Sequence, residues 1–316
     1  PPRASAVLHS LQAVGYDVPT AIADIIDNSL AARASTVAVT MTFDGPRSFV
    51  RITDNGDGMD AGVLDMAMRL GSQHPGTHRA TGDHGRFGLG LKTASFGQCR
   101  RLTVRSRPAN GEEQTRSWDL DHVEKEDSWA LRHGPWDPDS DSRLGHIAGS
   151  GTTVLWEKMD RVVEDPAHPS AHEDFDRKIA ETVDHLGMVF HRLIDAKTSP
   201  VTITVNGRQV HGWDPLLSRH QSTRELAARK LQVAGVQILV VPYIIPPESR
   251  LSPEDARRAA GPHGWLAHQG FYLYRNRRLL VTGGWLGLGR RDPQHSRARI
   301  RVDVDNRLDD LLRIDI

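Results

Sequence analysis

Four short segments, each rich in glycine or in polar residues, constrain this chain more than any other feature of its sequence. They occupy residues 24–29, 54–59, 85–93 and 151–154. Each segment alone would be a weak signal, because short glycine patterns occur by chance in many proteins. Together and in this order, they predict one pocket to which a helix, a tight turn, a glycine-rich loop and a strand each contribute.

Residues 24–29 (Asp-Ile-Ile-Asp-Asn-Ser) are predicted to lie on a helix that starts near Pro19 and Thr20. One side of this helix would face a core, because its residues recur at helical spacing: Ile22, Ile25, Ile26 and Ser29. Asp24 and Asn28 are four residues apart and would stack on the opposite side. There the Asn28 carbonyl oxygen could bind magnesium, and the Asp24 carboxylate could deprotonate a water aimed at a phosphate. Taken alone, the segment is better interpreted as the solvated face of an amphipathic helix.

Residues 54–59 (Asp-Asn-Gly-Asp-Gly-Met) follow a predicted strand at 49–53 and indicate a tight turn. Gly56 and Gly58 permit a close approach to the main chain, against which a flat heterocycle could lie. Asp54 could then accept a hydrogen bond from an exocyclic amine such as that of adenine. The alternative is an ordinary Asp-Asn-Gly turn between two elements.

Residues 85–93 (Gly-Arg-Phe-Gly-Leu-Gly-Leu-Lys-Thr) lead into a predicted helix at 91–96. Gly85, Gly88 and Gly90 can expose backbone amides, and amides at a helix start favour anionic phosphates. Lys92 adds a full positive charge. The spacing is neither that of a dinucleotide fingerprint nor that of a P-loop, in which the lysine directly follows the last glycine.

With these segments the chain resembles the GHKL ATPase superfamily, which includes gyrase B subunits, heat-shock chaperones, histidine kinases, MutL and the MORC proteins. The resemblance covers nearly the whole chain, and residues 271–280 and 303–316 look closer to MORC-like ATPases of prokaryotic type. It implies an α/β fold, with a Bergerat-type ATP-binding α/β sandwich followed by a transducer-like α/β domain.

The resemblance also implies roles for individual residues. Asn28 would bind magnesium, Asp54 would read adenine, and residues 85–90 would close over the phosphates. Thr152 and Thr153 match the last nucleotide-site segment of the family, on a strand beneath the adenine. The implied catalytic residues are Asp24 and Lys92. The implied ATP-binding residues are Asn28, Asp54, Gly56, Gly58, Met59, Gly85, Arg86, Phe87, Gly88, Leu89, Gly90, Thr93 and Thr153.

Two positions depart from the family pattern. Asp24 stands where these ATPases usually carry glutamate, and a carboxylate displaced by about 1 Å can cost about two orders of magnitude in rate. We therefore expect slow hydrolysis. Ala31 stands where a second aspartate is usual, which removes a supporting hydrogen bond and leaves the magnesium ligand in place.

The composition indicates a protein with two domains and no disulfide framework. The chain has 316 residues, 38% of them hydrophobic, and one cysteine, Cys99. The domains are expected at residues 1–165 and 166–316, with a polar boundary at 164–170. We expect a cytoplasmic protein, because no signal peptide and no apolar run of about 20 residues are present. The chain begins at Pro1 and ends at Ile316 within a structured motif, so we expect a piece of a longer protein whose second domain is truncated.

Local patterns place several further elements. Strands are predicted at residues 37–43, 49–53, 102–107 and 152–157, and a long helix at 171–194. Residues 137–143 are predicted to form a loop because they are rich in aspartate, serine and proline. Residues 201–207 predict a strand that enters an Asn-Gly hairpin turn, and Ser252 is predicted to cap a helix.

Charge is balanced overall, with 40 basic and 40 acidic residues, but residues 275–301 hold eight arginines and only Asp292 among the acids. This tract is interpreted either as a surface for a phosphate backbone or as a solvated surface with one arginine that serves ATP. A zinc site at His168 and His172 is disfavoured, because Pro169 lies between them and no cysteine joins them.

The sequence therefore predicts a magnesium-dependent ATP-binding and ATP-hydrolysing module. By resemblance, ATP would drive closure and homodimerisation, and the module would act on DNA, in bacterial restriction or defence. Two alternatives remain: an ATP-sensing scaffold with little hydrolysis, and a histidine kinase. The kinase is disfavoured because it needs a phosphoacceptor helix pair that the sequence does not indicate.

Overall fold

The computed structural model describes residues 17–69, 90–163, 165–261 and 263–308. The first of its two compact units comprises the chain up to Leu186 together with Lys197–Val210, and the second comprises Gly187–Ala196 and the chain from His211 onward. Helices accompany sheets in both units, which confirms the expected α/β class. The domain boundary expected at residue 165 lies within the first unit and remains a prediction about independently folding domains.

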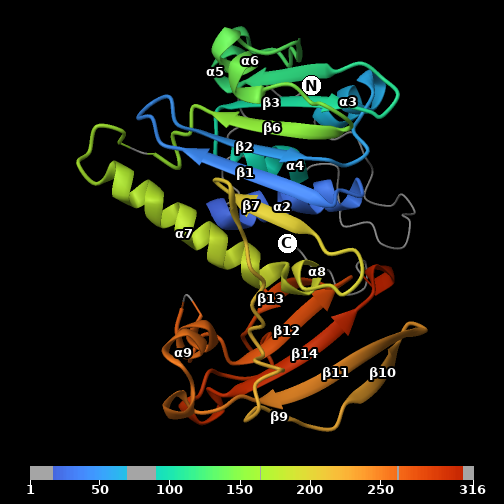
Figure 1. The fold of residues 1–316 in the computed structure, drawn as a ribbon, viewed down its shortest axis with the longest axis vertical. Helices are drawn as coiled ribbons and strands as arrows, with labels where there is room; N and C mark the ends of the chain where they lie inside the picture. Colours follow the sequence, from blue (N-terminus) through green and yellow to red (C-terminus); the bar gives the residue numbers. More distant parts are fainter. Residues whose placement is uncertain (1–16, 70–89, 164, 262, 309–316) are drawn as a thin grey trace. The chain divides into compact units, whose positions relative to one another are not determined.

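An eight-stranded sheet forms the centre of the first unit (Figure 1), in the order β5-β4-β3-β6-β2-β1-β7-β8. Neighbouring strands are antiparallel except β1 and β7, which are parallel. The strands are β1 (Thr36–Thr42), β2 (Phe49–Asp54), β3 (Arg101–Arg107), β4 (Gln114–Asp119), β5 (Arg132–His133), β6 (Gly151–Glu157), β7 (Thr202–Val205) and β8 (Arg208–Gln209). The four strands predicted in the first domain are β1, β2, β3 and β6, each within one residue at either end.

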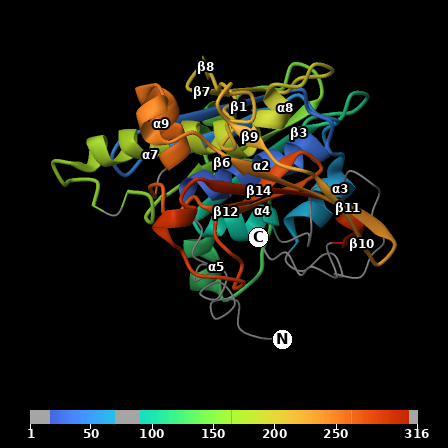
Figure 2. The ribbon, with the colours of Figure 1, turned by 90° about the horizontal axis from the view of Figure 1, so that it is seen from below.

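Three helices pack on one face of this sheet: α2 (Val18–Ala31), α3 (Ala61–Met68) and α4 (Gly90–Phe96), as Figures 1 and 2 show. The core lies between them and the strands, where Ile22, Val50 and Trp156 are all fully buried. The Trp156 indole donates a hydrogen bond to Ser95 Oγ of α4 at 2.8 Å. Helices α2 and α4 also pack against each other, so the first and third sequence segments meet.

Helix α2 begins at Val18, one residue before the expected start at Pro19. Asp17 is its N-cap, and the Asp17 carboxylate accepts a hydrogen bond from the Thr20 amide at 2.8 Å. Val18 and Pro19 follow at the first helical positions, where a proline loses no hydrogen bond. The aspartate is the stronger start signal, because it satisfies an amide that would otherwise have no partner.

Residues 137–143 are not a loop as predicted. They form most of α6 (Pro138–Leu144), because the Asp137 side chain caps the helix through the Ser140 amide at 2.8 Å and Pro138 occupies its first turn. The Ser140 hydroxyl then donates to Glu157 of β6 at 2.6 Å. Aspartate, serine and proline thus supply a helix start here, whereas their composition alone suggested a loop.

The long helix predicted at 171–194 is divided. Helix α7 (Ala171–Val189) ends before Phe190, and α8 (His191–Ile194) follows as a short helix. Phe190 is fully buried, with φ −104° and ψ 6°, outside the helical range. Helical spacing is retained on both sides of this residue, so periodicity gave no sign of the break. The other helix of the first unit is α5 (Leu120–Glu126).

The second unit contains a six-stranded sheet in the order β10-β11-β14-β12-β13, with β9 paired to β11. Its strands are β9 (Arg224–Glu225), β10 (Arg229–Val233), β11 (Val236–Ile244), β12 (Gly270–Arg275), β13 (Arg278–Thr282) and β14 (Ala298–Val304). Helix α9 (Pro253–Ala260) is capped by Ser252, as predicted. The expected Asn-Gly turn joins β7 and β8 of the first unit, with Asn206 and Gly207 both at positive φ. Among the described residues, no helix is both long and apolar enough to cross a bilayer.

Candidate functional site

Helix α2 presents the two faces that its sequence predicts. Its core-facing residues are at most 4% exposed: Ile22, Ile25, Ile26 and Ser29. On the other side Asn28 is exposed and Asp24 is half-buried, one helical turn earlier. An amide and a carboxylate therefore lie at the surface of the same helix, where a ligand has access to both.

Asp54, the last residue of β2, accepts three hydrogen bonds from the protein near this helix. One carboxylate oxygen, Oδ2, accepts a hydrogen bond from the Ser29 hydroxyl at 2.7 Å. The other, Oδ1, accepts from the amides of Gly56 at 2.9 Å and Thr152 at 3.1 Å. A carboxylate has about four acceptor positions, so these bonds leave one open on Oδ2. Asp54 is thereby fixed in orientation while it retains capacity for one external donor.

The environment of Asp54 disfavours its charge. Burial raises the pKa of this carboxyl above its ordinary value of 3.8, and the nearby charge of Asp57 raises it further. The hydrogen bonds from Ser29, Gly56 and Thr152 act in the opposite direction and do not fully offset burial. Its pKa is therefore raised by desolvation, and an additional hydrogen-bond donor would favour the charged form.

The glycines around Asp54 are required by the protein's own backbone. A Cβ on Gly58, which has φ +70°, would lie 1.9 Å from the carbonyl oxygen of Arg107. A Cβ on Gly151 would lie 2.0 Å from the carbonyl oxygen of Asp54. We expected the glycines of residues 54–59 to make room for a heterocycle. The described contacts show that Gly58 first of all lets the turn approach the end of β3.

Ser106 near the end of β3 connects the turn to β6, and no motif in the sequence pointed to this residue. The Met59 amide donates to Ser106 Oγ at 2.8 Å, and the hydroxyls of Ser106 and Thr152 are also 2.8 Å apart. Thr153, which the resemblance assigns to ATP, is only 1% exposed and pairs its hydroxyl with that of Thr53 at 3.1 Å. Thr152 therefore lies closer to the Asp54 carboxylate, through its own amide.

The third sequence segment is only partly described. Gly85, Arg86, Phe87, Gly88 and Leu89 lie outside the described residues, whereas Gly90, Lys92 and Thr93 belong to α4. A Cβ on Gly90 would meet no atom of the described residues within 4 Å. Lys92 is fully buried, and its ammonium donates to the carbonyl oxygens of Ala67 and Arg69 at the end of α3. Its predicted contact with phosphates remains a prediction.

Known proteins match the part of the chain that contains these residues. Residues 16–144 match the family model described as histidine kinase-, DNA gyrase B-, and HSP90-like ATPase. This is a GHKL ATPase segment. The match spans Asp24, Asn28, Asp54 and Lys92, and it stops before β6. The mixed α/β sheets are consistent with the fold of GHKL ATPases, whose members bind ATP.

A shorter similarity relates the chain to a DNA mismatch repair protein MutL from Rhodospirillum rubrum. The two are 34% identical over 95 residues, which is 28% of this chain and 14% of the MutL protein. The chain therefore matches a small part of that relative. The similarity supports the GHKL assignment and does not extend to the finer MORC-like assignment expected from the sequence.

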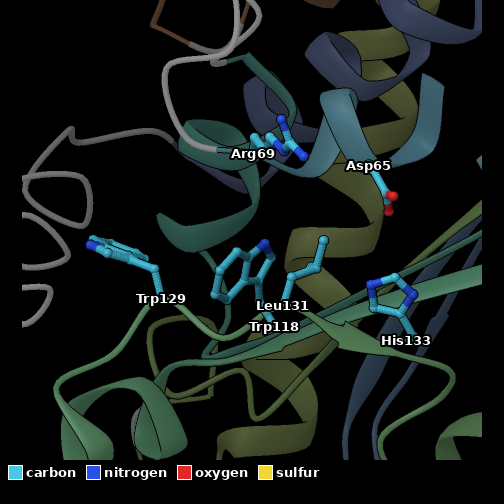
Figure 3. Close-up of a pocket in the computed structure, with 6 residues that line it drawn as sticks. All are labelled: Asp65, Arg69, Trp118, Trp129, Leu131 and His133. Carbon is cyan, nitrogen blue, oxygen red and sulfur yellow. The ribbon is translucent and has the colours of Figure 1, made fainter. Parts of the chain in front are cut away.

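A hollow of 450 Å³ lies apart from Asp54, beside α3 (Figure 3). It is lined by Asp65, Arg69, Trp118, Trp129, Leu131 and His133. The two indole rings meet edge to face at 5.9 Å, and Asp65 is paired with the buried Arg116 at 2.5 Å. None of these residues was predicted as functional, because they come from separate elements with no shared motif.

The arginine-rich tract of the second unit is divided between exterior and interior. Arg277, Arg290 and Arg291 are exposed. Arg278 is only 3% exposed and lies over the Phe190 ring at 4.5 Å, and Arg299 is fully buried. Only part of the tract is therefore available to an external phosphate group.

Proposed function

We propose that the chain binds ATP together with magnesium and hydrolyses it, with the site on α2 and at the end of β2. The main support is the Asp54 carboxylate, which three protein donors hold in place and which keeps one acceptor position for the adenine amine. The GHKL match of residues 16–144 supports the same ligand.

The residues of α2 fit a magnesium ion. Asn28 offers an exposed amide oxygen and Asp24 a carboxylate one turn earlier. Magnesium usually takes one or two protein oxygens and completes its shell with phosphate oxygens and waters. When bound, the ion would neutralise charge on the phosphates. Asp24 would orient a water and accept its proton as the water attacks the terminal phosphate.

The magnesium assignment is tested by Asn28→Ala. Loss of a metal ligand should weaken magnesium-dependent ATP affinity by about tenfold or more, which corresponds to about 1.4 kcal/mol. Isothermal titration calorimetry with a non-hydrolysable ATP analogue measures it. Adenosine without magnesium is the control, because its affinity should be the same for both proteins. An unchanged affinity for the magnesium complex would contradict the role of Asn28.

A second function, an ATP-sensing scaffold with little hydrolysis, is favoured by the length of the Asp24 side chain. Aspartate is one methylene shorter than the glutamate usual at this position, so its carboxylate lies farther from a bound water. Turnover by the unmodified chain separates the two proposals. Binding without measurable hydrolysis would support the scaffold.

More specifically, we propose that the chain is a MORC-like module. In such a module, ATP drives closure and homodimerisation, and the dimer acts on DNA. Exposed Arg290 and Arg291 supply positive charge for a phosphate backbone, and the MutL relative is named for DNA mismatch repair. A role in bacterial restriction or defence rests on the sequence resemblance alone. Light scattering with and without the ATP analogue tests dimerisation, and a mass that stays monomeric would contradict it.

A further inference from the structure

Residues 286–291 (Leu-Gly-Leu-Gly-Arg-Arg) lie between β13 and β14 in the second unit, and all of them are exposed. We refer to them as the exposed loop. Leu286 is 58% exposed and Leu288 80%, and no other large hydrophobic side chain of the described residues is as exposed as Leu288. Arg290 and Arg291 follow directly in the sequence. The exposed loop therefore offers two apolar side chains to a ligand, beside two positive charges.

The exposed loop is held at both ends by one buried side chain. Gln269 is fully buried, and its Oε1 accepts hydrogen bonds from the Trp285 indole at 2.9 Å and from the Asp292 amide at 3.0 Å. The Trp285 ring also meets the rings of Phe271 at 6.0 Å and His295 at 5.8 Å, edge to face in both contacts. The residues directly before and after the exposed loop are thus fixed, so the loop projects from a firm base.

Leu286 occupies a backbone position that leucine disfavours. The Leu288 amide donates to the Trp285 carbonyl oxygen at 2.8 Å, which closes a tight turn around Leu286 and Gly287. Both of these central residues have positive φ, 51° for Leu286 and 79° for Gly287. Such turns favour asparagine or glycine, because a larger side chain strains the left-handed backbone. A leucine here is therefore unfavourable both for the backbone and for its solvated side chain.

Exposed leucines beside arginines match the chemistry of a protein that bends duplex DNA. Such proteins insert apolar side chains, leucine among them, between neighbouring base pairs, while arginines bind the phosphates. A lipid surface fits less well, because the basic clusters that bind anionic lipids hold about four to eight lysines or arginines. Insertion at one base step needs only the few apolar atoms that the exposed loop presents.

We propose that the exposed loop binds duplex DNA, with Leu286 and Leu288 inserted between base pairs and Arg290 and Arg291 on the adjacent phosphates. This role rests on the proposed function, in which the arginines contact DNA, and it adds a mode of contact that the charge of the loop does not provide. The arginines make the affinity depend on salt, whereas the leucines unstack a base step and kink the duplex.

Leu286→Asn together with Leu288→Ser tests the insertion. Asparagine suits the left-handed backbone at residue 286, so the double variant should fold as stably as the unmodified chain, which chemical denaturation checks. Its affinity for duplex DNA should fall by about tenfold, or about 1.4 kcal/mol. The slope of log affinity against log salt should stay unchanged, because a leucine neutralises no phosphate. Energy transfer between dyes at the two duplex ends should report a bend with the unmodified chain and none with the variant.

Two further variants separate insertion from other effects. Leu231→Gln replaces a leucine that is 48% exposed on β10 of the same sheet, and it should leave both affinity and bend unchanged. Arg290→Ala together with Arg291→Ala should weaken binding and flatten the salt slope, which is the response that the leucine variant should not give. An affinity that falls equally in the leucine variant and in Leu231→Gln would contradict a specific role for the exposed loop.

The outcomes also distinguish this role from the proposed function. If the leucine variant binds and bends DNA as the unmodified chain does, the insertion is overturned and the DNA contact of the arginines stands. If the unmodified chain binds no duplex, with or without the ATP analogue, the DNA part of the proposed function fails and the insertion fails with it. Vesicles of anionic phospholipid and light scattering test the other occupants. A leucine variant that loses vesicle binding or changes its mass, with DNA binding unaffected, would assign the exposed loop to a lipid surface or a second copy and overturn the proposal.

Discussion

At the scale of single residues, the proposed site has two carboxylates with different hydrogen-bond environments. Asp54 and Asp24 are both half-buried, but Asp54 is held by Ser29, Gly56 and Thr152, whereas Asp24 lies on the outer side of α2. A carboxylate fixed at the end of a strand suits recognition of a ligand, and one at the surface of a helix suits proton transfer to and from a bound water. The two residues therefore lead to different predictions.

Asp24→Asn should abolish ATP turnover and leave ATP affinity within a few-fold, because a group that acts only in the transition state contributes to rate and little to ground-state binding. Steady-state hydrolysis and calorimetry measure the two quantities. Asp24→Glu is the matched control, since it restores the carboxylate with one more methylene, and it should keep or raise the rate. A rate insensitive to Asp24→Asn would remove this residue from the mechanism.

Nucleotide affinity should fall as the pH falls through the pKa of Asp54. Burial raises that pKa above 3.8, so the loss occurs at a higher pH than for an ordinary aspartate. The carboxylate loses its charge on protonation and becomes a poorer acceptor for the adenine amine. The sign for stability is opposite: the contribution of Asp54 to the free energy of unfolding is present at low pH and is lost as the pH rises through the raised pKa.

Calorimetric titrations with ADP from neutral to about pH 4 measure this dependence. Asp54→Asn is the control, because it cannot titrate and any dependence it retains belongs to the ligand. Equal pH profiles for the two proteins would show that Asp54 does not read the nucleotide.

At the scale of elements, the turn between β2 and α3 is set by the backbone. Gly58 has φ +70°, and its Cα lies against the Arg107 carbonyl at the end of β3. This contact, with the Met59 bond to Ser106, holds the turn to a strand that is not its sequence neighbour. The turn that follows β2 is therefore also bonded to the end of β3.

Gly58→Ala should destabilise the chain by about 2–5 kcal/mol, from about 1–2 kcal/mol for the left-handed backbone and about 1–3 kcal/mol for the clash with Arg107. Gly90→Ala is the matched control, since a Cβ there meets none of the described atoms within 4 Å and alanine favours a helix. Chemical denaturation followed by tryptophan fluorescence compares them. Equal stabilities would mean that the turn relaxes away from β3 at little cost.

At the scale of the whole molecule, the proposed interaction with DNA rests on the exposed arginines of the second unit. Arg290→Ala together with Arg291→Ala should flatten the dependence of log affinity for duplex DNA on log salt by up to about two units, because each lost phosphate contact removes about 0.9 unit. Arg277→Ala should instead impair ATP turnover or closure and leave the slope unchanged. Replacement of Arg278 is less informative, because this side chain is buried against Phe190.

Duplex binding at several salt concentrations, with and without the ATP analogue, measures both effects. If neither variant alters DNA binding or turnover, the exposed arginines form a solvated surface. The family resemblance and the short MutL similarity would then be the only remaining support for the DNA proposal.

Local sequence patterns were sufficient to predict several secondary-structure elements of this protein. The sequence alone predicted the two faces of α2, the strands β1, β2, β3 and β6, the Asn206–Gly207 turn and the Ser252 cap, because periodicity and capping act within a few residues. The same local reasoning missed α6 and the break at Phe190, where composition and helical spacing do not specify the backbone of a single residue. Only the tertiary structure decided that Ser106 meets Thr152, that Asp54 is bonded from both Ser29 and Thr152, and that the ammonium of Lys92 lies on the end of α3. These contacts join residues that are far apart in the chain, and they depend on strand register and helix packing, which no short stretch of sequence encodes.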